Sequence, residues 1–277
     1  MKRIYFIAIL ATVIAGGIIF YACQKDNNEL LTNKAKVTKS NGALVNPMEH
    51  VGILHNGCID YMYSQHNATD LTADELWTVY GVGYFSDRLG ADYVAVPLST
   101  INAISEKVRC LVNDRRIVTI IDELAENEKL DSEFSSPYII ENNYTILYNF
   151  FRYMDNVVVH SEEDYLRVQQ AVVDCEQKIL ANYYSLLEHG IFENNHRLLA
   201  EYEETMACMA IANKSGKIWY RINGEWMALE DWELTLQCQK TDLSAWSDYY
   251  NYGNSSSAAS QASTKASSDA GKIYLAW

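Results

Sequence analysis

The chain has 277 residues, and its 36 acidic and 22 basic side chains give a formal net charge of −14 at pH 7. This negative charge disfavours binding to nucleic acid or to anionic lipid through bulk electrostatics. Only 3 prolines and 13 glycines occur, and so few helix-breaking residues favour long helices over a β protein with many turns. We therefore expect an all-α protein.

The first 22 residues have the pattern of an export signal. Lys2 and Arg3 precede an uncharged, largely apolar stretch that ends at Ala22, directly before Cys23. A small residue before such a cysteine resembles the lipobox of bacterial lipoproteins, in which the cysteine is acylated and becomes the first mature residue. The alternative is an uncleaved anchor that spans the bilayer. Both interpretations place the rest of the chain outside the cytoplasm.

The residues after Cys23 bear on the location of the mature protein. The run Gln24-Lys25-Asp26 resembles the export tag of lipoproteins in Bacteroides-type bacteria, which directs them to the outer face of the outer membrane. This resemblance implies a lipid-anchored protein of the cell envelope, at the outer membrane and displayed on the surface. Residues 23–45 are polar and lack periodicity, so we expect a flexible tether.

Residues 46–215 are expected to form a helical domain of about six or seven helices, because apolar side chains recur there at helical spacing. The first helix is predicted to begin at Asn46, the second at the capping box that starts with Thr72, and the third at Ser99. The sixth is the best defined, since Ser161 and three following acids suit a helix start and Gly190 suits its end.

The pattern changes after residue 215. Two aromatic runs, 218–222 and 225–229, flank Asn223-Gly224, which is the signal of a β-hairpin. A helix–loop–helix turn is the alternative. We assign residues 216–252 to a small aromatic C-terminal unit packed on the helices. Residues 253–277 are rich in serine and alanine, and we expect a flexible tail that buries little.

Two short stretches resemble uncharacterised lipoproteins of Bacteroides-type bacteria. Residues 52–60 carry the G-x-x-H-N pattern of that group, just after the tether, with His55 and Asn56 at its end. Residues 209–215, followed by Trp219-Tyr220, form the second stretch. The family brings no established activity, so the resemblance implies an architecture and a location but no mechanism.

His55 and Cys58 are three residues apart and share a helix face. A metal could bridge them, but zinc would need two more ligands, and no sequence around Cys58 matches a catalytic cysteine signature. The other interpretation is that His55 hydrogen-bonds a neighbouring helix end, with Asn56 assisting, while Cys58 fills the core. We favour this interpretation and expect neither a metal nor a cofactor.

Acids and cysteines are numerous but carry weak signals. Two groups of acids could supply the paired carboxylates of a glycoside hydrolase. The first group is Asp122, Glu123, Glu126 and Glu128, and the second is Glu201, Glu203 and Glu204. We expect instead that both groups lie on solvated helix faces.

Five cysteines remain after Cys23: Cys58, Cys110, Cys175, Cys208 and Cys238. Because this number is odd, at least one thiol is unpaired, and the pairing of the others is left open.

The aromatic residues near the C-terminus give the strongest binding signal. Trp226, Trp232 and Trp246 could stack on sugars or anchor a protein partner if exposed, or could form a core if buried. We predict a non-enzymatic envelope lipoprotein that binds a glycan or protein partner through these residues. The alternatives are an envelope hydrolase whose acids or His55 line a cleft, and a purely structural or toxin-like surface protein.

Overall fold

The computed structural model describes residues 39–40, 43–227, 232–252 and 256–275. Contacts divide the chain into two units, residues 1–45 and 46–277. In the first unit, β1 (Lys39–Ser40) and β2 (Ala43–Leu44) form an antiparallel pair in which Lys39 lies opposite Leu44. The predicted signal peptide, Cys23 and most of the predicted tether lie outside the described residues.

In the described part of the second unit the regular structure is helical, which confirms the predicted all-α class. The elements are α2 (Glu49–Tyr63), α3 (Ala73–Leu76), the π-helical turn η1 (Trp77–Gly81), α4 (Val82–Leu89), the short η2 (Gly90–Asp92), α5 (Leu98–Asn113), α6 (Thr119–Glu126), α7 (Asn143–Asn156), α8 (Glu162–Glu188), η3 (Ile191–Asn194), α9 (His196–Met227), α10 (Trp232–Tyr252) and α11 (Ser256–Leu275).

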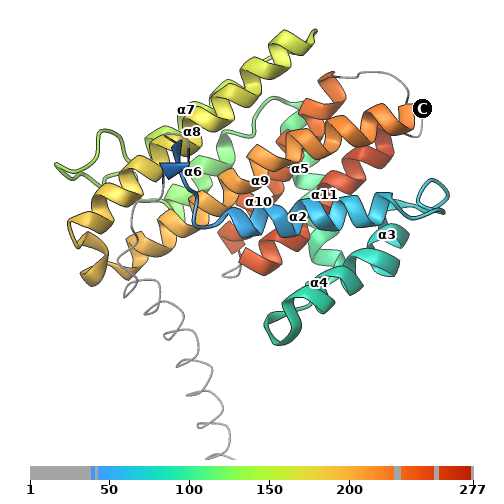
Figure 1. The fold of residues 1–277 in the computed structure, drawn as a ribbon, viewed down its shortest axis with the longest axis horizontal. Helices are drawn as coiled ribbons and strands as arrows, with labels where there is room; N and C mark the ends of the chain where they lie inside the picture. Colours follow the sequence, from blue (N-terminus) through green and yellow to red (C-terminus); the bar gives the residue numbers. More distant parts are fainter. Residues whose placement is uncertain (1–38, 41–42, 228–231, 253–255, 276–277) are drawn as a thin grey trace, which may run out of the picture. The chain divides into compact units, whose positions relative to one another are not determined.

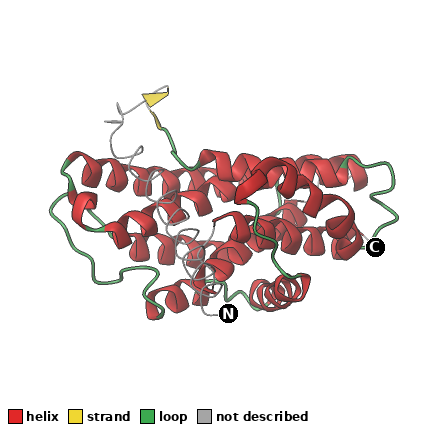
Figure 2. Ribbon diagram, turned by 90° about the horizontal axis from the view of Figure 1, so that it is seen from below, coloured by secondary structure: helices red, strands yellow, loops and turns green. Residues whose placement is uncertain are grey.

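The long helices lie side by side (Figure 1). α10 packs against α9, α11 and α5, and α2 packs against α9 and α11. Figure 2 shows them stacked in rows and joined by loops at their ends. None of the helices in the described residues is both long and apolar enough to cross a membrane.

Several helix ends follow the chemistry expected from the sequence. Thr72 and Glu75 form the predicted capping box, in which the Thr72 hydroxyl accepts from the Glu75 amide and the Glu75 carboxylate accepts from the Thr72 amide. Ser161 caps α8 by accepting from the Asp164 amide at 3.2 Å. The first helix begins at Glu49 rather than at Asn46, although Oδ1 of Asn46 accepts from the Met48 amide at 2.8 Å while its amide group donates to Glu176.

The predicted β-hairpin is wrong, because residues 218–227 continue α9 without a break. Ile218, Trp219 and Ile222 are 9%, 0% and 1% exposed, and their spacing places them on one helix face against the core. The Trp219 ring also packs edge-on against Tyr63, with centroids 5.4 Å apart. Burial of this face as a helix outweighs the local turn preference of Asn223-Gly224.

The predicted flexible tail is also wrong, because residues 256–275 form α11, whose described side chains are mostly buried. Several of its hydroxyls bond within the helix: Thr264 donates to the Ser260 carbonyl and Ser268 to the Thr264 carbonyl, both at 2.8 Å. These bonds satisfy the polar atoms without water. Small side chains also allow close approach, since a Cβ on Gly271 would lie 2.7 Å from the Trp219 ring.

The proposed boundary between a helical domain and an aromatic C-terminal unit is not present. α9 runs through residues 215 and 216 without interruption, and residues 46–277 form a single unit. The aromatic residues of α9 and α10 instead help to build the common core: Trp219 is 0% and Trp246 2% exposed. Large apolar surfaces of this kind stabilise the fold most when they are buried together.

Candidate functional site

The three tryptophans predicted to bind a partner differ in their surroundings. The side chain of Trp226 lies outside the described residues, although its backbone belongs to α9. Trp232 is half-buried and stacks on Tyr220 with centroids 4.7 Å apart and planes 10° apart, while Tyr165 lies 5.2 Å away. Trp246 is buried and stacks on Tyr250. For Trp246, burial favours the alternative role in the core.

His55 lies at the centre of a buried polar cluster. Its Nδ1 faces Oδ1 of Asn56 at 3.0 Å, and its Nε2 lies 2.9 Å from Oδ1 of Asp242. The Asn56 amide group donates to the Lys214 carbonyl at 2.7 Å, which leaves the Asn56 oxygen as the acceptor. Both ring nitrogens therefore face oxygen atoms that can accept a hydrogen bond.

Asp242 accepts hydrogen bonds from two further helices. Its Oδ2 accepts from the Ser215 hydroxyl and, at 2.9 Å, from Nε1 of Trp219, both on α9. Ser263 on α11 donates to the Asp242 carbonyl at 2.8 Å and lies 3.1 Å from Nε2 of His55. The cluster thus ties α2, α9, α10 and α11 together through one carboxylate.

This cluster does not have the geometry of a Ser–His–Asp catalytic triad. In a triad the serine and the acid bind opposite nitrogens of the histidine, whereas Ser263 and Asp242 both approach Nε2 of His55. All three residues are 0% exposed and line neither pocket described below. His55 does meet an acid of another helix, as a hydrolase would need, but it does so inside the core and not in a cleft.

Not all of the acids flagged in the sequence lie on a solvated face. Glu201 is only 3% exposed, and burial raises its pKa to about 7 even though its carboxylate accepts from the Asp131 amide at 2.9 Å. Burial also raises the pKa of Glu203. Glu123 on α6 pairs with Lys107 at 2.7 Å. The expectation of a wholly solvated acidic face is therefore wrong for Glu201.

The cysteines of the described residues are all free thiols. Cys58 is 0% exposed and lies near the Gly81 carbonyl, and burial raises its pKa well above the usual value. A raised pKa disfavours the reactive thiolate. Within the described residues no group of three or more metal-ligating side chains lies together.

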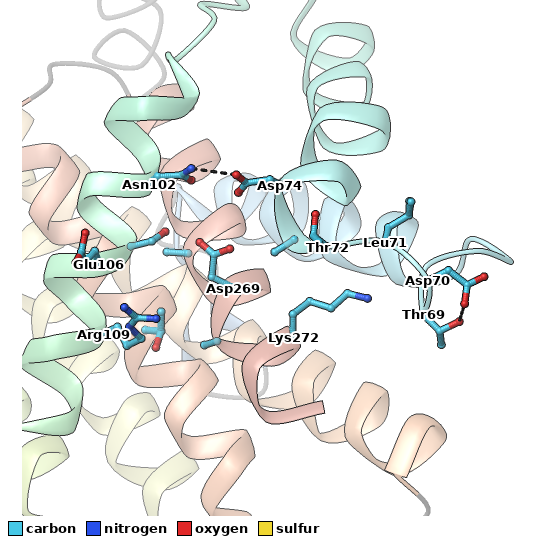
Figure 3. Close-up of a pocket in the computed structure, with 15 residues that line it drawn as sticks. Thr69, Asp70, Leu71, Thr72, Asp74, Asn102, Glu106, Arg109, Asp269 and Lys272 are labelled. Atoms are coloured by element: carbon cyan, nitrogen blue, oxygen red, sulfur yellow. Dashed lines mark hydrogen bonds between the residues drawn. The ribbon is translucent and has the colours of Figure 1, made fainter. Parts of the chain in front are cut away.

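A pocket of about 850 Å³ lies between three parts of the chain (Figure 3). One wall is the segment 69–74, which leads into α3; the second is α5 and the third is α11. α5 contributes Asn102, Ser105, Glu106 and Arg109, and α11 contributes Ala266, Asp269, Ala270 and Lys272. The volume lies within the range of small-molecule sites, and the sequence had not singled out any of these residues as a site.

A fully buried lysine holds the walls of this pocket together. Lys265 on α11 donates to Asp269 at 2.6 Å and to Asn102 on α5 at 3.2 Å, and it pairs with Asp74 on α3 at 2.7 Å. The hydrogen bond from Lys265 lowers the pKa of Asp74, so its charge is retained. An ammonium group withdrawn from water is tolerated only with such partners, and here they fix the pocket walls.

Two groups on the α5 wall are left without partners. Ser105 is 8% exposed, and its hydroxyl has no hydrogen-bond partner. Arg109, one turn further along α5, is exposed and forms no ion pair with another described side chain. Because a buried hydroxyl without a partner is costly, an incoming polar ligand would stabilise Ser105.

A second hollow of about 500 Å³ lies against a neighbouring face of α5 and is lined by Ser99, Thr100, Ala103, Ile104, Lys107, Asp248 and Tyr249. Its two charged side chains pair with each other, since Lys107 binds Asp248 at 2.6 Å, although Oδ2 of Asp248 has no hydrogen-bond partner. The first pocket, which leaves a guanidinium group unpaired, is therefore the better candidate for a ligand site.

The sequence held few signals for this pocket. Lys265 and Asp269 are four residues apart, a spacing that favours an ion pair on a helix, but they stand in a segment interpreted as a tail. Asp74 was visible only as part of a helix start. No protein-family model, curated protein or solved structure matches this chain.

Proposed function

We propose that this chain is a lipoprotein of the cell envelope that binds a small polar molecule in the pocket between residues 69–74, α5 and α11. It holds the molecule without performing chemistry on it. The binding role agrees with the class of function expected from the sequence, but the site moves from the tryptophans of the C-terminal segment to the pocket that Lys265 organises.

The unpartnered hydroxyl of Ser105 carries this proposal. Buried polar groups in folded proteins almost always have a hydrogen-bond partner, and the exceptions call for an explanation. Ser105 lines an open pocket of about 850 Å³, so a ligand atom would supply the missing partner. The ion pairs of Lys265 fix the walls in advance, which reduces the entropy lost when a ligand binds.

The envelope location rests on the N-terminal sequence. The uncharged stretch that ends at Ala22, the following Cys23 and the polar run after it together support export and attachment to a lipid, with the helical unit on the outer membrane and facing the outside. A binding protein at the surface would encounter small solutes, or soluble fragments of larger polymers, before they enter the cell.

A hydrolase built around His55 has less support. A hydrolytic histidine must reach the substrate directly or through one water molecule, and His55 is 0% exposed with both nitrogens engaged. The pocket contains acids but no described histidine or cysteine. Binding without chemistry is therefore the function that these side chains support best.

The binding role can be tested by thermal unfolding of the full-length chain in detergent micelles. The chain would be heated with amino acids, dipeptides, sugars, nucleosides, polyamines and dicarboxylates in turn. A ligand present at 100 times its Kd adds about 2.7 kcal/mol to the stability, which raises Tm by roughly 5–10 °C in a protein of this size. If no compound of any class raises Tm, the proposed function is wrong.

Two variants of α5 locate the site. Ser105→Met extends an adaptable side chain into the pocket and should weaken binding of any ligand found by at least tenfold. Ala103→Met, on the same helix but facing the second hollow, should leave the affinity unchanged. If Ala103→Met weakens binding and Ser105→Met does not, the ligand occupies the second hollow and the proposed site is wrong.

A further inference from the structure

Charged side chains of both signs line the main pocket, and only some of them have an ion-pair or hydrogen-bond partner. Asp74 and Oδ1 of Asp269 bind Lys265, while Lys272 donates to the Ala68 carbonyl at the edge of the pocket. Among the described residues, the lining acids Asp70 and Glu106 form no ion pair. Oδ2 of Asp269 and the guanidinium group of Arg109 also have no such partner. These two groups stand on different walls, α11 and α5 (Figure 3).

The arrangement excludes several classes of ligand. The pocket lining, all of it described, contains no aromatic ring, so it lacks the flat surface on which a sugar or nucleobase stacks. A polyanion such as a phosphate ester would meet the acids Asp70, Glu106 and Asp269 at a cost in like-charge repulsion. A simple amine would leave the guanidinium group of Arg109 without an ion-pair partner and would meet a second positive charge at Lys272.

A ligand with one positive and one negative charge avoids these unfavourable interactions. Its carboxylate can pair with Arg109, whose planar guanidinium group presents two parallel donors that match a carboxylate. Its ammonium group can donate to Oδ2 of Asp269, and the Ser105 hydroxyl, which lines the same pocket, can gain a partner. Glu106 stands beside Arg109 on α5 but forms no ion pair with it, so it does not block the guanidinium group.

We propose that the pocket binds a zwitterion, a free amino acid or a short peptide, with its carboxylate on Arg109 and its ammonium group on Asp269. This inference rests on the proposed function and names its ligand class. The volume of about 850 Å³ exceeds what a single small amino acid fills, so di- and tripeptides fit as well as amino acids with long side chains.

Isothermal titration of the full-length chain with a dipeptide and two modified forms of it tests this assignment. The unmodified dipeptide should bind. Its N-acetylated form lacks the ammonium group and its C-terminal amide lacks the carboxylate, and each should bind at least tenfold more weakly. If both modified forms bind as tightly as the dipeptide, the zwitterion assignment is wrong even though the pocket binds a ligand.

A charge-reversal variant tests whether Arg109 binds the carboxylate of the ligand. Arg109→Glu should abolish binding of the dipeptide and should retain or improve binding of its C-terminal amide, which is a cation. Arg152→Glu, an exposed arginine on α7 outside the pocket, serves as the matched control and should bind the dipeptide normally. Unchanged dipeptide binding by Arg109→Glu would overturn the role of Arg109.

Failure of this inference can be told apart from failure of the proposed function. If a sugar, a nucleoside or a dicarboxylate is the compound that raises Tm, and Ser105→Met weakens it, the pocket is a binding site but not for a zwitterion. If no class of compound raises Tm, both the binding role and the zwitterion assignment fall.

Discussion

Asp242 is a buried residue that holds several interior polar side chains. His55, Ser215 and Trp219 all bond to its carboxylate inside a region with no exposure to solvent. Replacement of the carboxylate by an amide leaves at least one of these buried donors without an acceptor, which costs about 1–3 kcal/mol. We therefore expect Asp242→Asn to destabilise the fold by about this amount, measured as a lower midpoint in urea unfolding.

A surface pair provides the control for Asp242. Asp60 pairs with Arg221, but its side chain is 53% exposed, and solvent reduces the contribution of such pairs to less than about 1 kcal/mol. Asp60→Asn should therefore shift the urea midpoint only slightly. If the two variants shift the midpoint equally, the buried cluster is not an important determinant of stability.

Glu201 gives a pH dependence whose sign follows from burial. Its pKa in the folded chain is raised to about 7 from an ordinary value of 4.5, so the folded state binds the proton more tightly than the unfolded state. The contribution of Glu201 to stability is then fully present at pH below 4.5 and falls as the pH rises to about 7.

The corresponding variant removes this dependence. Glu201→Gln should be more stable than the natural chain at about pH 8, by at most about 3 kcal/mol, and close to it at about pH 4. Glu126→Gln, on an exposed position of α6, should show no such difference between the two pH values. Urea unfolding at both pH values measures the effect, and an equal stability change at both would contradict it.

At the scale of elements, two helical glycines show how packing overrides helix propensity. A Cβ at Gly271 on α11 would lie 2.7 Å from the Trp219 ring, which is itself 0% exposed and fixed by its bond to Asp242. At Gly83 on α4 nothing lies within 4 Å of the corresponding position. The same substitution should therefore have opposite effects at the two sites.

Alanine substitution compares them directly. Gly83→Ala should stabilise the chain by about 0.5–1 kcal/mol, because alanine is the better helix former. Gly271→Ala should destabilise it by roughly 1–2 kcal/mol, since the overpacking cost exceeds the same gain in propensity. Thermal unfolding of both variants gives the signs, and stabilisation by Gly271→Ala would mean that α11 does not press against Trp219.

The hairpin and the tail were mispredicted for related reasons. Asn223-Gly224 has a strong local turn preference, but Trp219, one helical turn before Asn223, and Ile222, directly before it, are buried on one face, and this burial decides the backbone. The Ser/Ala-rich segment has few large apolar side chains, so its burial depends on close approach to other helices. Neither effect can be read from a window of sequence around the segment itself.

For the whole molecule, α11 is the element whose loss should matter most. It packs against α10, α5 and α2, and it supplies both Ser263 to the buried cluster and Lys265 to the pocket wall. A chain that ends at Tyr252 should therefore lose the cooperative thermal transition seen for the full chain by circular dichroism. A tail without structural contacts would leave that transition unchanged.

The predicted lipid anchor is tested on whole cells. Mass spectrometry should find a lipid-modified Cys23 at the N-terminus, and protease added to intact cells should remove the helical unit rapidly. Cys23→Ala should lack the lipid and leave the membrane fraction. A periplasmic protein that resists the protease in the same cells serves as the control, and equal protection of this chain would place it inside the envelope.

The sequence by itself determined the all-α class, the capping box at Thr72 and the start of α8 at Ser161. These features depend on residues close together in the chain, where spacing and capping chemistry act locally. The tertiary structure alone decided that α11 is buried, that His55 meets Asp242, and that Lys265 joins Asp74 to form a pocket wall. The pairs His55–Asp242 and Lys265–Asp74 join residues more than 180 positions apart, and such partners meet only after the helices have packed, which no local pattern records.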